Sequence, residues 1–137
     1  MPIFVQIHPN PSQSLRQSFE SLAVALGCMP GMYFEMDGSF VWVDHRSKPV
    51  GQMDGMVYDR DGCLEYVEIK GNCTPDQWLT LCRAVCGVPI SQSRDAEADD
   101  LTRSYSTIEK MIRVHFVTEG GWTSAREIAS RLAANLG

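Results

Sequence analysis

A hairpin pattern in the middle of the chain constrains the fold more than any other feature of the sequence. Two strand-like runs, residues 51–59 and 63–71, flank the turn sequence Asp59-Arg60-Asp61-Gly62. A glycine at the end of such a turn is typical of a type I turn followed by a bulge, the usual three-residue hairpin loop. This loop pairs residue 59 with residue 63, and the register then pairs 58 with 64, 54 with 68 and 52 with 70.

The predicted register sorts the side chains of the hairpin by face, because successive side chains of a strand point to opposite sides. One face is expected to pack on the core, and its apolar residues are Met53, Val57, Val67 and Ile69. The other face carries Asp54, Glu68 and Lys70. A two-residue loop that pairs 59 with 62 would instead divide the two carboxylates between faces. Any site on this hairpin therefore depends on the turn.

Patterns on either side of the hairpin predict an α+β fold with an α/β-like core. Apolar residues that recur every three or four positions indicate helices, and clusters of β-branched and aromatic residues indicate strands. The expected elements are a helix from Ser12 or Ser14 to about Leu26, strands at Met32–Glu35 and Ser39–Asp44, the hairpin, a helix from Thr74 to Gly87, a short helix that gives way to a strand near Met111, and a helix opened by the capping box Ser124–Glu127.

No internal break divides residues 1–137, so we expect a single domain. Its predicted architecture is an N-terminal helix, an antiparallel strand meander, a crossover helix, a further strand and a C-terminal helix. The proline-containing segment before Ser12, which includes His8, is assigned to no element.

Charge and cysteine content limit the functional classes. The 17 Asp and Glu exceed the 12 Lys and Arg, and the formal net charge of −5 is the wrong sign for a protein that coats nucleic acid by charge alone. No apolar run approaches the roughly 20 residues that span a bilayer, and no signal-peptide pattern is visible. The 5 cysteines are an odd number, which is typical of reduced thiols and predicts a cytoplasmic protein without a cysteine metal site.

The polar stretch at residues 88–104 is expected to be a mobile loop. It contains the acidic cluster from Asp95 to Asp100, and a run of like charge is by default a solvated surface. The sign of this cluster suits electrostatic docking to a basic protein partner.

The polar face of the hairpin is the candidate site. In the predicted register Asp54 lies opposite Glu68, and like charges directly opposed across a ladder are destabilising. A divalent cation relieves this repulsion, and two carboxylates with water suit Mg²⁺ or Mn²⁺. Lys70 lies two residues beyond Glu68 on the same face, where an ammonium group can orient a metal-bound water. Together these groups suit hydrolysis of a phosphodiester.

The spacing of these residues resembles the PD-(D/E)XK nuclease superfamily, which has the restriction-endonuclease-like fold. The motif of that family is an acid on one central strand and then Asp or Glu, any residue and Lys on the next; here Asp54 takes the first position and Glu68-Ile69-Lys70 the second. The resemblance implies metal-dependent cleavage of DNA or RNA, with Asp54 and Glu68 as metal ligands and Lys70 as a catalytic residue. It also implies Glu20, on the first helix, as a further acid. Met53 stands where the family motif has proline.

Two other classes stay open. One is a non-catalytic interaction protein, such as an inhibitor or a subunit of a complex, and the other is an α+β domain whose curved sheet binds a small molecule. Cations for phosphate binding are sparse near the hairpin and are limited to Arg46, Lys48 and Arg60. Histidine as a residue type suits acid–base and metal roles, which makes His45 and His115 candidates, but the sequence does not position these two histidines relative to each other. Trp122 is a candidate for an exposed ring that stacks on bases.

Overall fold

One antiparallel sheet organises the part of the chain that the computed structural model describes, residues 2–11, 17–45, 51–87 and 98–134. The fold class is α+β, as predicted. The elements are β1 (Ile3–Pro9), α1 (Phe19–Gly27), β2 (Met32–Phe34), β3 (Ser39–Asp44), β4 (Gly51–Arg60), β5 (Cys63–Gly71), α2 (Pro75–Cys86), α3 (Ala98–Met111), β6 (Ile112–Phe116), β7 (Trp122–Thr123) and α4 (Ala125–Ala134).

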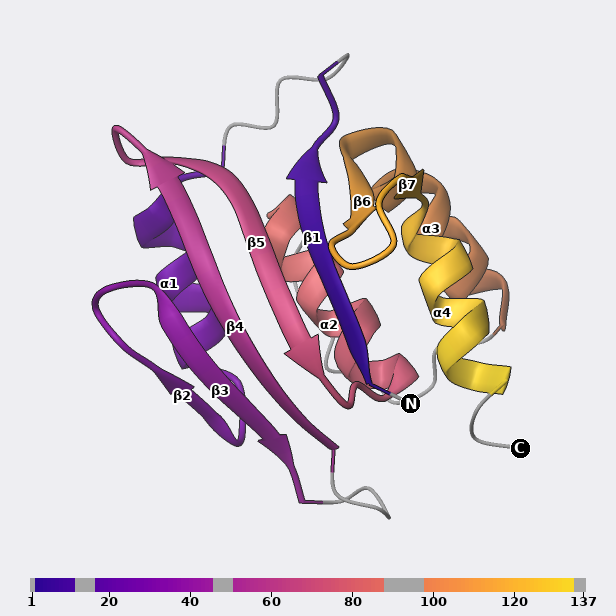
Figure 1. The fold of residues 1–137 in the computed structure, drawn as a ribbon, viewed down its shortest axis with the longest axis horizontal. Coiled ribbons are helices and arrows are strands. Elements are labelled where there is room, and N and C mark those ends of the chain that lie inside the picture. Colours follow the sequence, from indigo (N-terminus) through magenta and orange to yellow (C-terminus); the bar gives the residue numbers. More distant parts are fainter. Residues whose placement is uncertain (1, 12–16, 46–50, 88–97, 135–137) are drawn as a thin grey trace.

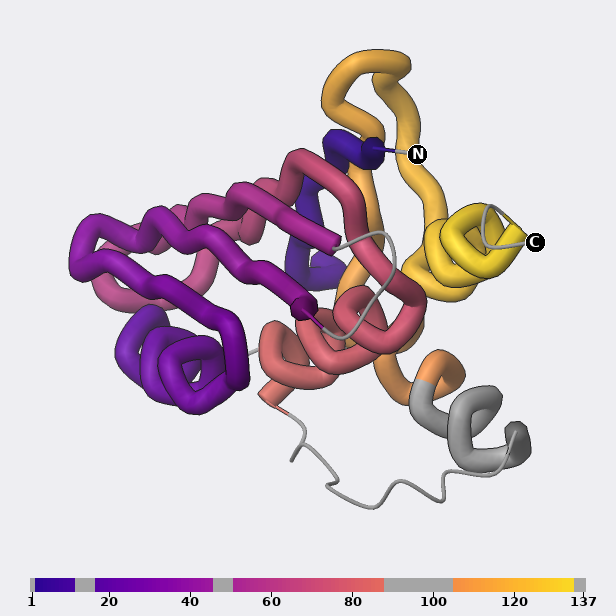
Figure 2. The backbone as a smooth tube through the Cα atoms, turned by 90° about the horizontal axis from the view of Figure 1, so that it is seen from below, coloured from indigo at the N-terminus to yellow at the C-terminus, as the bar shows by residue number. Residues whose placement is uncertain are grey.

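The sheet has the order β2-β3-β4-β5-β1-β6-β7, and every neighbouring pair is antiparallel. The first strand therefore lies inside the sheet: Ile7 is opposite Val67 of β5 and opposite Val114 of β6. All four helices pack on the same side of the sheet (Figure 1). Seen from below, no helix covers the other face, beyond which the loop between β6 and β7 projects (Figure 2). We call this second side the open face.

The core lies between the sheet and the helices. The four apolar hairpin residues predicted to face it, Met53, Val57, Val67 and Ile69, are at most 3% exposed. Trp78 of α2 is fully buried, and its indole Nε1 donates a hydrogen bond to the carbonyl oxygen of Ala125 at 2.9 Å. A buried indole N–H needs such a partner, and this one fixes α4 against α2.

Local signals at the helix ends are confirmed for α2. The Thr74 hydroxyl accepts from the backbone N–H of Gln77, whose side chain accepts from the backbone N–H of Thr74, a complete capping box. Gly87 ends the helix with φ +73°, a left-handed conformation that favours glycine. The strands β2 and β3, the change from α3 to β6 after Met111 and the start of α4 also follow the sequence prediction.

The predicted register of the β4–β5 hairpin is wrong. Asp61 and Gly62 both have positive φ, +54° and +83°, so they form a two-residue turn and Arg60 pairs with Cys63. A bulge follows, because Asp59 pairs with Leu64 while Tyr58 pairs with Tyr66, which leaves an extra residue on β5. The two changes together place residue 54 opposite residue 70.

Other boundaries also differ from the prediction. The segment before Ser12 contains β1, which was not predicted. α1 begins at Phe19 with Ser18 as its N-cap, later than expected, while Ser12 and Ser14 lie outside the described residues. Gly27, which follows Leu26 and is the residue type that most readily ends a helix in a left-handed conformation, lies instead within α1, and the cap is Cys28 in a right-handed conformation.

The expected acidic loop is described only in its second part. Its residues 88–97 lie outside the described part of the chain, whereas residues 98–104, which were also predicted to be loop, form the start of α3. Among the described helices, none is long and apolar enough to span a membrane.

Candidate functional site

The open face of β4 and β5 carries the three hairpin residues predicted from the sequence. Asp54 pairs with Lys70 on β5 and with Val41 on β3, whereas Glu68 pairs with Met56. Asp54 and Glu68 are thus diagonal neighbours, for which Cα atoms are about 7–8 Å apart. The predicted opposition of two carboxylates does not occur, because the amine and not Glu68 lies opposite Asp54.

The surroundings of Glu68 and Lys70 differ from those expected. An oxygen of the Glu68 carboxylate accepts a hydrogen bond from Nε2 of Gln6 at 3.0 Å. Lys70 Nζ lies 5.3 Å from the centroid of the Phe4 ring, and no ion pair within 4.0 Å joins it to Asp54. Both contacts come from β1, the strand that the sequence did not predict.

The donor set for a metal is limited to two carboxylates. Among the described residues, no group of three or more His, Cys, Asp or Glu side chains is arranged to hold an ion. Asp54 and Glu68 share a solvent-facing side of adjacent strands, and Mg²⁺ is commonly held by one or two carboxylates and water. The residues therefore fit a site in which two carboxylates and water hold Mg²⁺. Within the described part of the chain they do not fit a site with three or more protein ligands.

Glu20 is not brought to this site. It lies on α1 (Phe19–Gly27), in the helix layer on the opposite side of the sheet from Asp54 and Glu68 (Figure 1). Arg46 and Lys48 lie outside the described residues, and His45 is exposed just after β3.

A row of aromatic rings crosses the open face next to the hairpin residues. Tyr58 of β4 stacks on Tyr66 of β5 with ring centroids 4.5 Å apart, and His8 of β1 stacks on the other side of Tyr66 at 4.9 Å. Trp122 of β7 then meets His8 edge-on at 5.0 Å. Four strands thus contribute to one continuous surface of rings, and Trp122 is 49% exposed.

Arg113 is the cation of this surface. Its guanidinium carbon lies 3.8 Å from the centroid of the Trp122 ring, and it has no carboxylate partner among the described residues. Its Nε and the Nδ1 of the neighbouring His115 are buried without a hydrogen-bond partner. Buried polar groups are usually paired, so these two nitrogen atoms keep unused hydrogen-bonding capacity beside the ring row.

A chain of hydrogen bonds sets the state of His8. The amide nitrogen of Gln6 donates to Glu68, so the amide oxygen of Gln6 faces Nε2 of His8 at 2.9 Å. Since that oxygen only accepts, His8 Nε2 must carry the proton, and in the neutral ring Nδ1 keeps its lone pair. Partial burial, and then the charges of His115 and Arg113, lower the pKa of His8 below its usual value, which favours this neutral form at pH 7.

A hollow of about 410 Å³ adjoins the aromatic row near the β4–β5 turn. Its polar lining includes His8, Arg60, Glu65 and Arg113. Arg60 and Glu65 are 3.6 Å apart and well exposed, and such exposed pairs contribute little energy. The hollow therefore has two arginines and one carboxylate at its wall.

Sequence reasoning missed His8 and Gln6 because it missed β1. It missed Arg113 because this residue lies beside His8 only through the pairing of β1 with β6. The signal was present: Ile3, Val5 and Ile7 alternate with polar and aromatic residues, the period-two pattern of a half-buried strand. Nothing local, however, could have paired this strand with β6.

No family model, curated protein or solved structure matches this chain.

Proposed function

We propose that this protein binds single-stranded nucleic acid on the open face of its sheet. The observation that carries the proposal is the Arg113 guanidinium, which has no carboxylate partner among the described residues and stacks on an exposed tryptophan beside a row of three more rings. Proteins that bind single strands combine aromatic stacking platforms with local positive charge.

Local charge supports this proposal although the net charge is −5. The strands β1, β6 and β7 contain no Asp or Glu, and their titratable side chains are His8, Arg113 and His115. Burial is the largest cause of the lowered pKa of His8, and His115 and Arg113 lower it further while Glu65 raises it. We infer that phosphates lie over β1 and β6 while bases stack on the rings.

The test is a fluorescence titration with a ten-nucleotide oligouridylate. Trp42 and Trp78 are 6% and 0% exposed while Trp122 is 49% exposed, so quenching by the ligand reports Trp122. A stacked base contributes about 1–3 kcal/mol, and we expect Trp122→Ala, followed by fluorescence anisotropy of a labelled oligonucleotide, to weaken binding about 5- to 150-fold. Tyr33→Ala is the matched control, because Tyr33 is 64% exposed on β2 at the far end of the sheet.

Salt and charge provide the second arm of this test. Arg113→Met removes the cation and keeps the length of the side chain, so it should weaken binding and reduce the dependence on salt. Equal affinity for wild type, Trp122→Ala and Arg113→Met, or no binding at 50 mM salt, would refute the proposal.

Metal-dependent cleavage of the bound strand is the second candidate function. It is favoured by one observation: Asp54, Glu68 and Lys70 lie on the same face as the ring row, with Met56 of β4 opposite Glu68. Asp54 and Glu68 would hold Mg²⁺, which supplies a Lewis acid for phosphodiester hydrolysis, and Lys70 would orient the phosphate. This proposal keeps the cleavage activity that the restriction-endonuclease-like motif implies, but it gives Glu20 no role.

Cleavage is measured with end-labelled RNA and DNA in Mg²⁺ or Mn²⁺ and in chelator. We expect Asp54→Asn and Lys70→Met to abolish metal-dependent products while oligouridylate binding is kept. Products that persist in both variants would exclude this site.

The five free thiols suit a reducing compartment, and we place the protein in the cytoplasm as part of the same proposal.

A further inference from the structure

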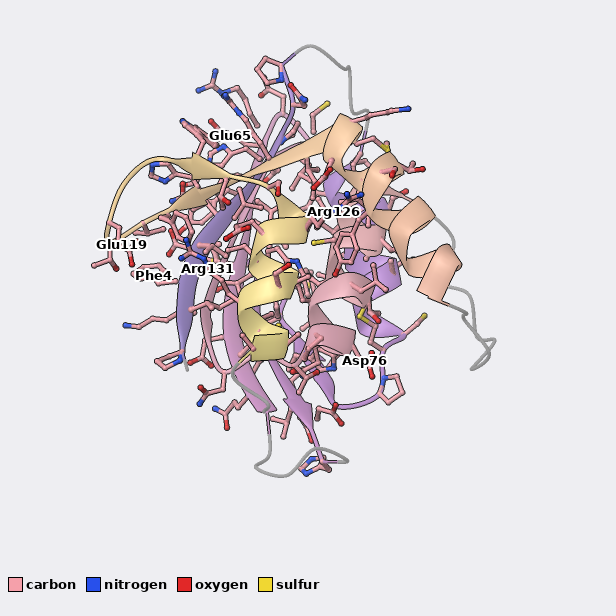
Figure 3. The ribbon with its side chains drawn as sticks, turned by 90° about the vertical axis from the view of Figure 1, so that its right-hand side faces the viewer. Phe4, Glu65, Asp76, Glu119, Arg126 and Arg131 are labelled. Atoms are coloured by element: carbon pink, nitrogen blue, oxygen red, sulfur yellow. The ribbon has the colours of Figure 1, made fainter. Side chains whose placement is uncertain are left out.

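A second hollow, of about 540 Å³, lies away from the ring row at the start of β1. Its walls come from β1, the end of β5, the end of β6 with the loop that follows it, and α4 (Ala125–Ala134). Figure 3 shows the labelled side chains Phe4, Glu119 and Arg131 gathered at this edge of the molecule, with Arg131 extending from α4. The volume falls within the range of small-molecule sites, roughly 300–1,000 Å³.

The lining is mainly apolar. Its apolar members are Pro2, Ile3, Phe4, Val5, Phe116, Ile128 and Leu132. Val5, Ile128 and Leu132 also belong to the hydrophobic core, so the hollow reaches the core at its base. A ligand that fills it must present an apolar body of several carbon atoms.

Charged groups at the mouth define the polar end of the ligand. Lys70 lines the hollow, and its Nζ lies 5.3 Å from the centroid of the Phe4 ring. No described carboxylate lies within ion-pair distance of that ammonium group. Arg131 lies over the Phe116 ring at 4.8 Å and contacts Glu127 at 3.5 Å. The charged residues of the lining are thus Lys70, Arg131 and Glu119. Arg131 contacts the carboxylate of Glu127, whereas Lys70 has no carboxylate partner among the described residues.

We propose that this hollow binds an amphipathic monocarboxylate, with its hydrocarbon part against the apolar wall and its carboxylate at Lys70. A carboxylate accepts a charge-assisted hydrogen bond from an ammonium group, whereas an alcohol of the same chain length gains only the apolar contacts. The proposal shares Lys70 with the proposed cleavage site, but it needs neither nucleic acid nor a metal. Carboxylate binding is measured in chelator and without nucleic acid, so its failure and the failure of the functions above are distinguishable.

The experiment compares three ligands of equal chain length: octanoate, octan-1-ol and octylamine. Calorimetry on the full chain, in chelator and at pH 7.5, gives each affinity. We expect octanoate to bind on the order of tenfold more tightly than octan-1-ol, since hydrogen bonds to charged groups contribute more than neutral ones, and octylamine to bind most weakly. Chemical-shift changes should centre on the methyl groups of Ile3, Ile128 and Leu132.

Two variants locate the site. Lys70→Met should reduce octanoate affinity to that of octan-1-ol and leave octan-1-ol unchanged, while Lys110→Met, an exposed lysine of α3, should change neither. Ile3→Trp places an indole in the hollow and should weaken all three ligands, with thermal unfolding as the check that the fold is kept. Binding of octylamine or octan-1-ol as tight as octanoate, an unchanged octanoate affinity in Lys70→Met, or no binding of any of the three at millimolar concentration overturns the proposal.

Discussion

Gly55, between Asp54 and Met56 on β4, provides a sharp test of how the sheet packs. It pairs directly with Phe40 of β3, and the Phe40 ring lies over it in the core, only 2% exposed. A Cβ added at Gly55 would come within 3.0 Å of three atoms of that ring. Gly55→Ala must therefore displace a buried phenyl ring.

The expected cost follows from overpacking. Inserted methyl groups in a well-packed core typically cost about 1–3 kcal/mol, and replacing glycine by alanine in a strand returns about 0.5–1 kcal/mol of backbone entropy. Because the added Cβ meets three atoms of a buried ring, the cost lies in the upper part of that range, about 2–3 kcal/mol, and the net loss after an entropy gain of about 1 kcal/mol is roughly 1–2 kcal/mol. For 137 residues the unfolding entropy is about 0.29 kcal/mol/K, so Tm should fall by about 3–7 °C.

The assay is thermal unfolding followed by circular dichroism, with Gly27→Ala as the matched control. Gly27 ends α1 and has no atom within 4 Å of an added Cβ, so that variant should be neutral or slightly stabilised. Phe40→Leu should cost less in the Gly55→Ala background than alone, because the smaller side chain makes room for the methyl group. A Gly55→Ala variant as stable as Gly27→Ala, or additive costs in the double variant, would refute this account of the β3–β4 contact.

Two further predictions concern titration and thiol access. Burial and the nearby charges of His115 and Arg113 lower the pKa of His8, so near its usual pKa the unfolded chain binds more protons than the folded protein. The free energy of unfolding should therefore fall between pH 7.5 and 5.5. Urea titrations should show a smaller fall for His8→Gln, and equal falls would contradict the assignment. Cys28 and Cys63 are exposed, whereas Cys73, Cys82 and Cys86 are buried, and burial raises the pKa of Cys86 to about 12. A thiol reagent at pH 8 should therefore modify two thiols rapidly and the other three only after unfolding. A third rapidly modified thiol would show that the core opens.

The sequence predicted which face of the hairpin is buried but not its register. Both depend on different information. The alternation of Met53, Val57, Val67 and Ile69 requires only that side chains alternate, and a shift of the register by two residues leaves it unchanged. The register depends on whether Asp61 adopts positive φ, as it does at +54°. The sequence Asp59-Arg60-Asp61-Gly62 is compatible with the expected three-residue loop and with the observed two-residue turn. No residue type in β5 indicates the bulge that follows the turn.

The ring row could not have been predicted from local sequence patterns. His8 and Arg113 are register partners across β1 and β6, although they are more than a hundred positions apart in the chain. Their proximity arises only when the first strand enters the sheet. Once β1 is recognised, however, the open-face positions of Phe4, Gln6 and His8 follow from the alternation with Ile3, Val5 and Ile7.

The central place of β1 has a consequence for how the molecule assembles during synthesis. Val5 pairs with Ile69 on one side and with Phe116 on the other, so β1 is synthesised before both of its neighbours and cannot be fully paired until Phe116, more than a hundred residues later, has been made. Pairings of such long sequence separation are slow to form. Until Phe116 has emerged, the nascent sheet has an unpaired hydrogen-bonding edge along β1 or β5. The chain is most prone to aggregate in that interval, and a chaperone that binds extended segments would protect it most then.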